Sequence, residues 1–100
     1  MAEITNLADP EQGVHAEVFE GRQPRTVRLH LEGDQRVPPH THPDTNIVIH
    51  LLSGRLELTL DHEQYELEPN DLVHCSGDRE ISPYALEPSV VIVVIAPRPG

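Results

Sequence analysis

Short apolar segments with a two-residue alternation run through most of the chain. Residues 26–32 alternate strictly between apolar and polar side chains, which predicts a strand with one buried and one solvated face. The alternation returns at 55–60 and, after a polar break, at 65–67, which predicts a hairpin. Further strands are expected at 71–75 and in the two apolar, β-branched runs at 46–52 and 90–96, which should be covered on both faces.

Turn-forming residues separate these segments and leave little room for helices. Ten prolines are spread along the chain, and about seven or eight strands are expected, with turn signals roughly every eight to twelve residues. We therefore expect an all-β sandwich or barrel that forms a single domain over residues 1–100, with its core at about 26–96. Residues 1–12 and the tail at 97–100 are expected to be held more loosely.

The charge balance excludes two classes of partner. Seventeen acidic residues stand against seven basic ones, all of them arginine, and the formal net charge is −10 at pH 7. Nucleic acids and anionic membrane surfaces both require a cationic face, so we expect neither as a partner. An acidic, lysine-free composition is typical of proteins from salt-loving microbes, where high ionic strength screens self-repulsion. A cationic partner is the alternative interpretation.

The expected compartment is the cytoplasm. No apolar stretch reaches the roughly 18 to 20 residues that a membrane span requires, and residues 1–6 lack the pattern of a secretory signal. The single Cys75 cannot form an internal disulfide, so nothing indicates an oxidising compartment. We expect Cys75 to serve as a small buried apolar side chain.

Two of the seven histidines form the best candidate for chemistry. His40 and His42 flank one residue after a Pro38-Pro39 entry, so on an extended chain both imidazoles project from the same face. Two imidazoles placed in this way can converge on one divalent ion. The histidines expected to be ordinary solvated side chains are His15, His30 and His62.

The surroundings of this pair resemble the first conserved motif of the cupin superfamily. That motif runs Gly, a short gap, His-x-His, three or four residues, Glu, and then Gly after the next strand, and residues 33–54 follow most of it. Residues 58–73 resemble the hairpin between the two cupin motifs, with Asn70-Asp71 where the family has Gly-Asp. The resemblance covers residues 26–96 and implies a double-stranded β-helix, or jelly-roll, barrel that pairs as a homodimer.

Three departures from the family pattern bear on metal binding. The resemblance places the motif's Glu at Asn46 and the second motif's His near Ile81, so two of the four family ligands are missing. Gly54 comes one residue later than usual, which predicts a bulge or a shifted register in the preceding strand.

Another histidine could complete the set. His74 lies near the position of the missing second-motif His, and His50 shares a strand face with Asn46. We expect a metal site formed by His40, His42 and His74, with His50 as the alternative third ligand. Neutral imidazoles favour Zn, Fe, Ni or Cu over Mg or Ca. The cofactor we expect is a divalent transition metal, namely Zn, Fe, Ni or Mn.

Two functions remain open at this level. The first is a cupin barrel that binds a divalent transition metal and a small polar molecule, with its chemistry and any catalytic residues unassigned. The alternative is a non-catalytic, metal-free module that binds or senses a small molecule, which the loss of two family ligands favours. No Gly-x-Ser-x-Gly elbow or Gly-rich phosphate loop adds a third possibility.

Overall fold

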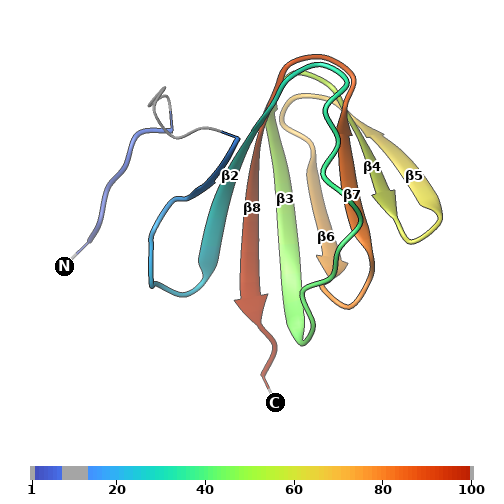
Figure 1. Cartoon of the computed structure of the whole chain (residues 1–100). Helices are drawn as coiled ribbons and strands as arrows, with labels where there is room; N and C mark the ends of the chain where they lie inside the picture. The colour runs from blue at the N-terminus through green and yellow to red at the C-terminus, as the bar shows by residue number, and fades with distance from the viewer. Residues whose placement is uncertain (1, 8–13, 100) are drawn as a thin grey trace.

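The computed structural model describes residues 2–7 and 14–99, and within these ranges all regular secondary structure is β-strand (Figure 1). The strands are β1 (His15–Glu17), β2 (Arg25–Leu31), β3 (Thr45–Ser53), β4 (Leu56–Leu60), β5 (Glu63–Leu67), β6 (Leu72–Ser76), β7 (Ile81–Ala85) and β8 (Ser89–Pro97). They form a five-stranded sheet in the order β1-β2-β8-β3-β6 and a three-stranded sheet in the order β5-β4-β7, both antiparallel. The all-β prediction is confirmed, and the described part of the chain has no helix that could cross a membrane.

The core lies between the two sheets and follows the alternation of the sequence. On β2 the side chains of Val27, Leu29 and Leu31 are all buried, as the pattern predicts. Arg28, on the face expected to be solvated, is also buried, because the N-terminal segment lies against it and accepts its hydrogen bond at Leu7. Antiparallel partners share a face, so the inward positions of β3 and β8 follow from the pairing of Val27 with Val93 and of Val93 with Ile49. The three-stranded sheet covers these residues with the buried leucines Leu56, Leu58, Leu60 and Leu67.

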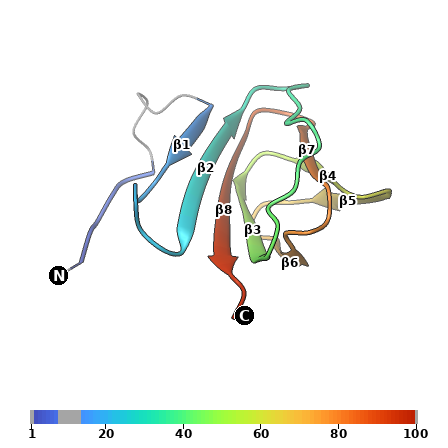
Figure 2. The same cartoon turned by 60° about the horizontal axis from the view of Figure 1, so that its bottom comes forward.

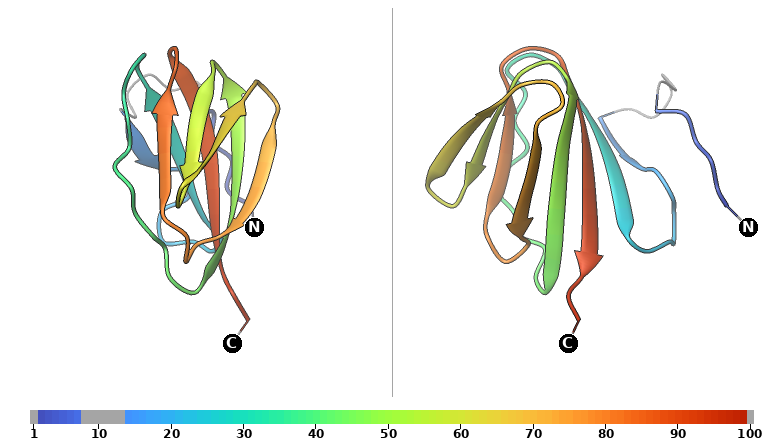
Figure 3. Two further views of the ribbon diagram at one scale, coloured as in Figure 1. Left: turned by 90° about the vertical axis from the view of Figure 1, so that its right-hand side faces the viewer. Right: turned by 180° about the vertical axis from the view of Figure 1, so that it is seen from behind.

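The outer face of the five-stranded sheet is only partly covered. Val48, Ile92 and Val94 point away from the core, because they alternate with its inward side chains, and each is half-buried. Figure 3 (right) shows this sheet from behind, with β6, β3, β8 and β2 side by side. The cover expected on both faces of residues 46–52 and 90–96 is therefore incomplete in the single chain.

Two predicted irregularities are found. The pairing of β3 with β8 shifts register between Leu51 and Ser53, and Gly54 follows with φ at +92°. A side chain at Gly54 would overlap Ser89, so this position requires glycine for space as well as for conformation. Asn70 has a φ of +75°, as expected where Asn replaces the family's turn glycine.

Strand β7 has no clear signal in the sequence because Pro83 interrupts it. Proline cannot donate a hydrogen bond to a neighbouring strand, so within a sheet it is confined to edges and bulges. In the structure β7 is an edge strand of the three-stranded sheet, which accommodates this residue.

The C-terminal tail is attached to the barrel through Arg98. Its backbone N–H donates to the Asp44 carbonyl at 3.0 Å, and its Nη2 donates to Asp78 Oδ2 at 2.7 Å. Near the other end, Arg28 donates to the Leu7 carbonyl at 3.0 Å. Of the segments expected to be loosely held, residues 1, 8–12 and 100 lie outside the described residues.

Candidate functional site

The segment that carries His40 and His42 runs extended along the free edge of β7 (Figure 2). His40 and Ile81 exchange backbone hydrogen bonds of 3.1 and 2.8 Å, and the Val37 N–H donates to the Pro83 carbonyl at 2.9 Å. Pro38 and Pro39 lie between these contacts, where their fixed φ favours an extended chain. The segment therefore follows β7 through isolated bridges at Arg36 and His40 without forming a regular strand.

A cluster of short contacts holds His42. Its N–H donates to the Gly77 carbonyl at 2.7 Å, and its own carbonyl accepts from Thr45 Oγ1 at 2.6 Å. The Gly77 N–H donates to the Thr45 carbonyl at 2.8 Å. A Cβ at Gly77 would overlap the His42 carbonyl oxygen and the Thr45 hydroxyl, so only glycine allows this approach.

The two imidazoles lie edge to face, with ring centroids 4.9 Å apart and an interplanar angle of 88°. Nδ1 of His40 is 2.9 Å from the Pro38 carbonyl oxygen. Because a carbonyl can only accept, Nδ1 carries the proton, and in the neutral ring Nε2 keeps a free lone pair. Burial, together with the electrostatic influence of the neighbouring His40, Arg25 and His15 side chains, lowers the pKa of His42 below its ordinary value, so this ring is neutral at pH 7.

Both rings line a cavity of about 330 Å³ between the five-stranded sheet and the segment 37–42. Its walls are apolar and come from Val27, Leu29, Val37, Pro38, Pro39, Val93 and Ile95. Its polar groups are the imidazoles of His15, His40 and His42 and the guanidinium of Arg25. A smaller apolar cavity of about 30 Å³ also borders both rings, and its other lining residues include Ile47 and Ile81.

The structure does not bring His74 or His50 to this cavity. His74 pairs with Val48 and His50 with Ile92, so both belong to the outer face of the five-stranded sheet. His74 is exposed, whereas the adjacent Cys75 is 6% exposed, as predicted for a small buried apolar side chain. Burial raises the pKa of the Cys75 thiol. The alternation of β6 therefore directs His74 away from His40 and His42.

Asn46, which the sequence places where the family has its Glu, does not face the two histidines either. Asn46 lies on the outer face, because it alternates with the fully buried Ile47. The family motif allows three or four residues before its Glu, and the longer spacing places that position at Ile47, which borders the small cavity. Ile81, at the second-motif position, lies directly opposite His40. Both inward positions are therefore isoleucine.

The sequence interpretation missed two residues of the cavity. Arg25 shares the face of Val27 and Leu29, so the alternation could have indicated it if extended one step towards the N-terminus. His15 lies on β1 opposite Leu29, on the same inward face; its side chain is exposed, as expected, and it also lines the cavity. This three-residue strand is too short for its alternation to be recognised, and only its pairing with β2 shows the direction of His15.

Comparisons with known proteins agree with this fold. The family model described as Cupin domain matches residues 27–95, whereas no curated protein sequence matches the chain. An RmlC-like cupin protein from Desulfovibrio desulfuricans is similar over 99% of both chains, with 20% identity and a TM-score of 0.84. TT1209 from Thermus thermophilus is similar over 98% of this chain and 100% of its own, with 23% identity and a TM-score of 0.78.

A third similar structure is KdgF from Halomonas sp., with 26% identity and a TM-score of 0.68 over 75% of this chain and 69% of that chain. The family match and these structures confirm the predicted jelly-roll barrel of the cupin type.

Proposed function

The chain belongs to the cupin family, and we propose that it binds a small organic molecule in the cavity between its five-stranded sheet and residues 37–42. The observation that carries this proposal is the composition of that cavity, in which apolar walls surround a few polar side chains. Ligand sites have this character, with volumes of roughly 300 to 1,000 Å³. At about 330 Å³ the cavity suits a small molecule rather than a dinucleotide-sized cofactor.

The polar side chains have complementary capacities. His40 offers an acceptor at Nε2, because its Nδ1 proton is directed to the Pro38 carbonyl. Arg25 offers only donors, and the neutral His42 ring offers one donor and one acceptor. An occupant with an apolar body and a polar end would therefore find partners for both of its parts.

The test uses neighbouring residues on opposite faces of β8. Val93 lines the cavity and Val94 points outward. A fragment library is screened against the purified chain by ligand-observed NMR. We expect Val93→Phe, which fills the cavity, to abolish binding of the fragments found, and Val94→Phe to leave it unchanged. Fragments that bind Val93→Phe as well as the native chain would refute this site.

A transition metal at His40 and His42 is our second candidate. The close approach of the two rings and the neutral state of His42 favour it, because only neutral imidazole binds metal. The donor set fits a weakly held ion, since the other two family positions are Ile47 and Ile81. In residues 2–7 and 14–99 there is no group of three or more His, Cys, Asp or Glu arranged to hold a metal. A bound Zn, Fe, Ni or Mn ion would supply a Lewis acid at this end of the cavity.

We also propose that the protein forms a homodimer, as the family resemblance implies. The half-buried outer side chains of Val48, Ile92 and Val94 are the residues that a second copy would cover. Sedimentation velocity should give twice the mass of the single chain. A monomer at micromolar concentration would contradict this expectation.

A habitat of high salt remains a proposal based on composition. The excess of acidic over basic residues, 17 against 7, should make stability rise from low to molar salt, because salt screens repulsion between like charges. A melting temperature that stays constant or falls with added salt would argue against it.

A further inference from the structure

Two hollows meet at one arginine. The apolar cavity described above shares Arg25, His42 and Ile95 with a second hollow of about 330 Å³. The other residues that line this second hollow, here called the polar groove, are Gln23, Thr41, Pro43, Thr45 and Pro97. Arg25 therefore lies where an apolar surface gives way to a polar one.

The Arg25 guanidinium has one edge engaged and one edge open. Its Nε donates to Glu17 Oε1 at 2.5 Å, and the described residues provide no other hydrogen bond to it. The side chain is 40% exposed. A guanidinium has five donors, and the pair on its Nη edge matches the two oxygens of a carboxylate. Glu17 therefore orients the group while the edge that recognises carboxylates stays accessible.

Two other arginines, Arg79 and Arg98, are more fully engaged. Arg79 donates to Asp61 Oδ2, Glu63 Oε1 and the Leu60 carbonyl. Arg98 donates to Asp78 and Ser76 and also lies near Asp44. These groups hold turns and strand ends together, whereas Arg25 borders both hollows.

The charge around Arg25 suits one negative group. The protein has 17 acidic residues, yet neither hollow has an Asp or Glu among its lining side chains. Three imidazoles, of His15, His40 and His42, line the cavity beside Arg25. A carboxylate at this point would meet cationic or neutral groups, with the Glu17 carboxylate on the far edge of the guanidinium.

Resting on the proposed function, we infer that the ligand is a small amphipathic carboxylic acid. Its carboxylate binds the Nη edge of Arg25, and its apolar body occupies the cavity lined by Val27, Leu29 and Val93. A single anchoring cation favours a monoanion over a phosphate ester, whose second charge would have no matching cation.

The test compares acids with their uncharged amides. Phenylacetate and hexanoate are each titrated into the full chain at pH 7, beside phenylacetamide and hexanamide, and binding is followed by calorimetry and ligand-observed NMR. We expect each acid to bind roughly tenfold to a hundredfold more tightly than its amide, as expected for a charge-assisted hydrogen bond. Arg25→Gln should remove that preference, and Arg25→Lys, which keeps the charge but loses the planar fork, should restore only part of it.

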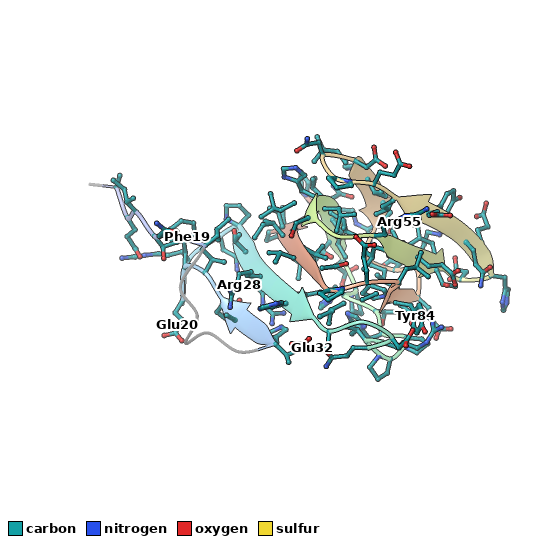
Figure 4. All side chains as sticks on the ribbon, turned by 90° about the horizontal axis from the view of Figure 1, so that it is seen from above. Phe19, Glu20, Arg28, Glu32, Arg55 and Tyr84 are labelled. Atoms are coloured by element: carbon teal, nitrogen blue, oxygen red, sulfur yellow. The ribbon has the colours of Figure 1, made fainter. Side chains whose placement is uncertain are left out.

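Two further variants exclude an effect of folding or of net charge. Glu17→Gln removes the negative charge beside Arg25 and keeps an amide oxygen there, so it should tighten acid binding. Arg55→Gln is the matched control, because Arg55 pairs with Glu66 and is not among the residues that line either hollow. Figure 4 shows Arg55 well separated from Arg28, which lies on the same strand as Arg25. Arg55→Gln should leave the preference for acids unchanged.

The outcomes separate this inference from the proposed function. Acids and amides that bind equally to the native chain, and whose binding Val93→Phe abolishes, would overturn the inference and leave the cavity as a binding site. A preference for acids that persists in Arg25→Gln would also overturn it. If the acids do not bind and Val93→Phe has no effect on any fragment, both proposals fail.

Discussion

His40 and Ile81 lie directly opposite each other and exchange two backbone hydrogen bonds, of 3.1 and 2.8 Å. The residue at the position of the family's distant histidine is therefore the neighbour of the first histidine of the pair. Its side chain is 4% exposed and borders the small apolar cavity with both imidazoles. An imidazole at position 81 would therefore lie beside His40 and His42, where the structure has the buried side chain of Ile81.

Placing a histidine at position 81 should create a stronger metal site. We expect Ile81→His to raise the affinity for Zn²⁺ or Ni²⁺ by at least roughly tenfold, because even indirect partners of metal ligands change affinity by about 10- to 100-fold. Without metal, the buried polar ring should cost about 1–3 kcal/mol of stability. Calorimetric titration and thermal unfolding measure the two effects. Leu86→His, at an exposed position after β7, is the control and should not bind more tightly.

Metal in the native protein, if bound, should depend on His42 and not on His74. Elemental analysis of protein purified without a His-tag and without chelator gives the content, and EDTA should lower the melting temperature of a metalloprotein. We expect His42→Ala to remove the ion, because its ring lies against His40, and His74→Ala to retain it, because His74 is exposed on the outer face. Equal loss in both variants would contradict the assignment. A metal content near zero in the native protein would exclude this second candidate.

The lowered pKa of His42 predicts a loss of stability on mild acidification. Because the folded state holds this pKa below its ordinary value of about 6.5, the unfolded state binds the proton more readily. The contribution of His42 to the free energy of unfolding is therefore fully present above pH 6.5, and it falls as the pH drops towards the pKa that His42 has in the folded state. Urea unfolding between pH 7.5 and 5 should show this slope, and it should be shallower in His42→Asn.

The effect of His42 can be distinguished from general acid denaturation by its pH range and by a control variant. Asp61, Glu63 and Asp78 have lowered pKa values because of hydrogen bonds from arginine side chains, backbone N–H groups or Tyr65. These carboxylates contribute to stability above their ordinary pKa values, and that contribution is lost only at lower pH, below about 4. His74→Asn, at an exposed position, should keep the native slope between pH 7.5 and 5.

A methyl group at Gly77 should displace the backbone that holds His42. Gly77→Ala would press a Cβ against the His42 carbonyl and the Thr45 hydroxyl, and we expect a loss of about 1–3 kcal/mol, as for other overpacked positions. The ring resonances of His42 should shift with it. Gly33→Ala is the control, because its nearest neighbours are at an ordinary 3.8 Å. Equal stability of the two variants would show that the contact at Gly77 is not required.

The sequence by itself determined the fold class and the inward faces of β2 and β4. The alternation at residues 26–32 and 55–60 correctly predicts buried side chains, because a strand turns every second residue to the same side. The His40-Thr41-His42 segment indicated the family, and Gly54 indicated the irregular register of β3. Each of these depends on local spacing, which a sequence contains directly.

Only the tertiary structure decided which side chains meet at the site. His74 lies near the expected position along the chain, yet the pairing of β6 with β3 makes Cys75 the inward residue. His15 and Arg25 reach the cavity through the pairing of β1 with β2 and of β2 with β8. These relations join residues far apart in sequence, so they depend on strand order and register. Local periodicity shows which residues share a face, and only the assembled sheets show which faces enclose the same cavity.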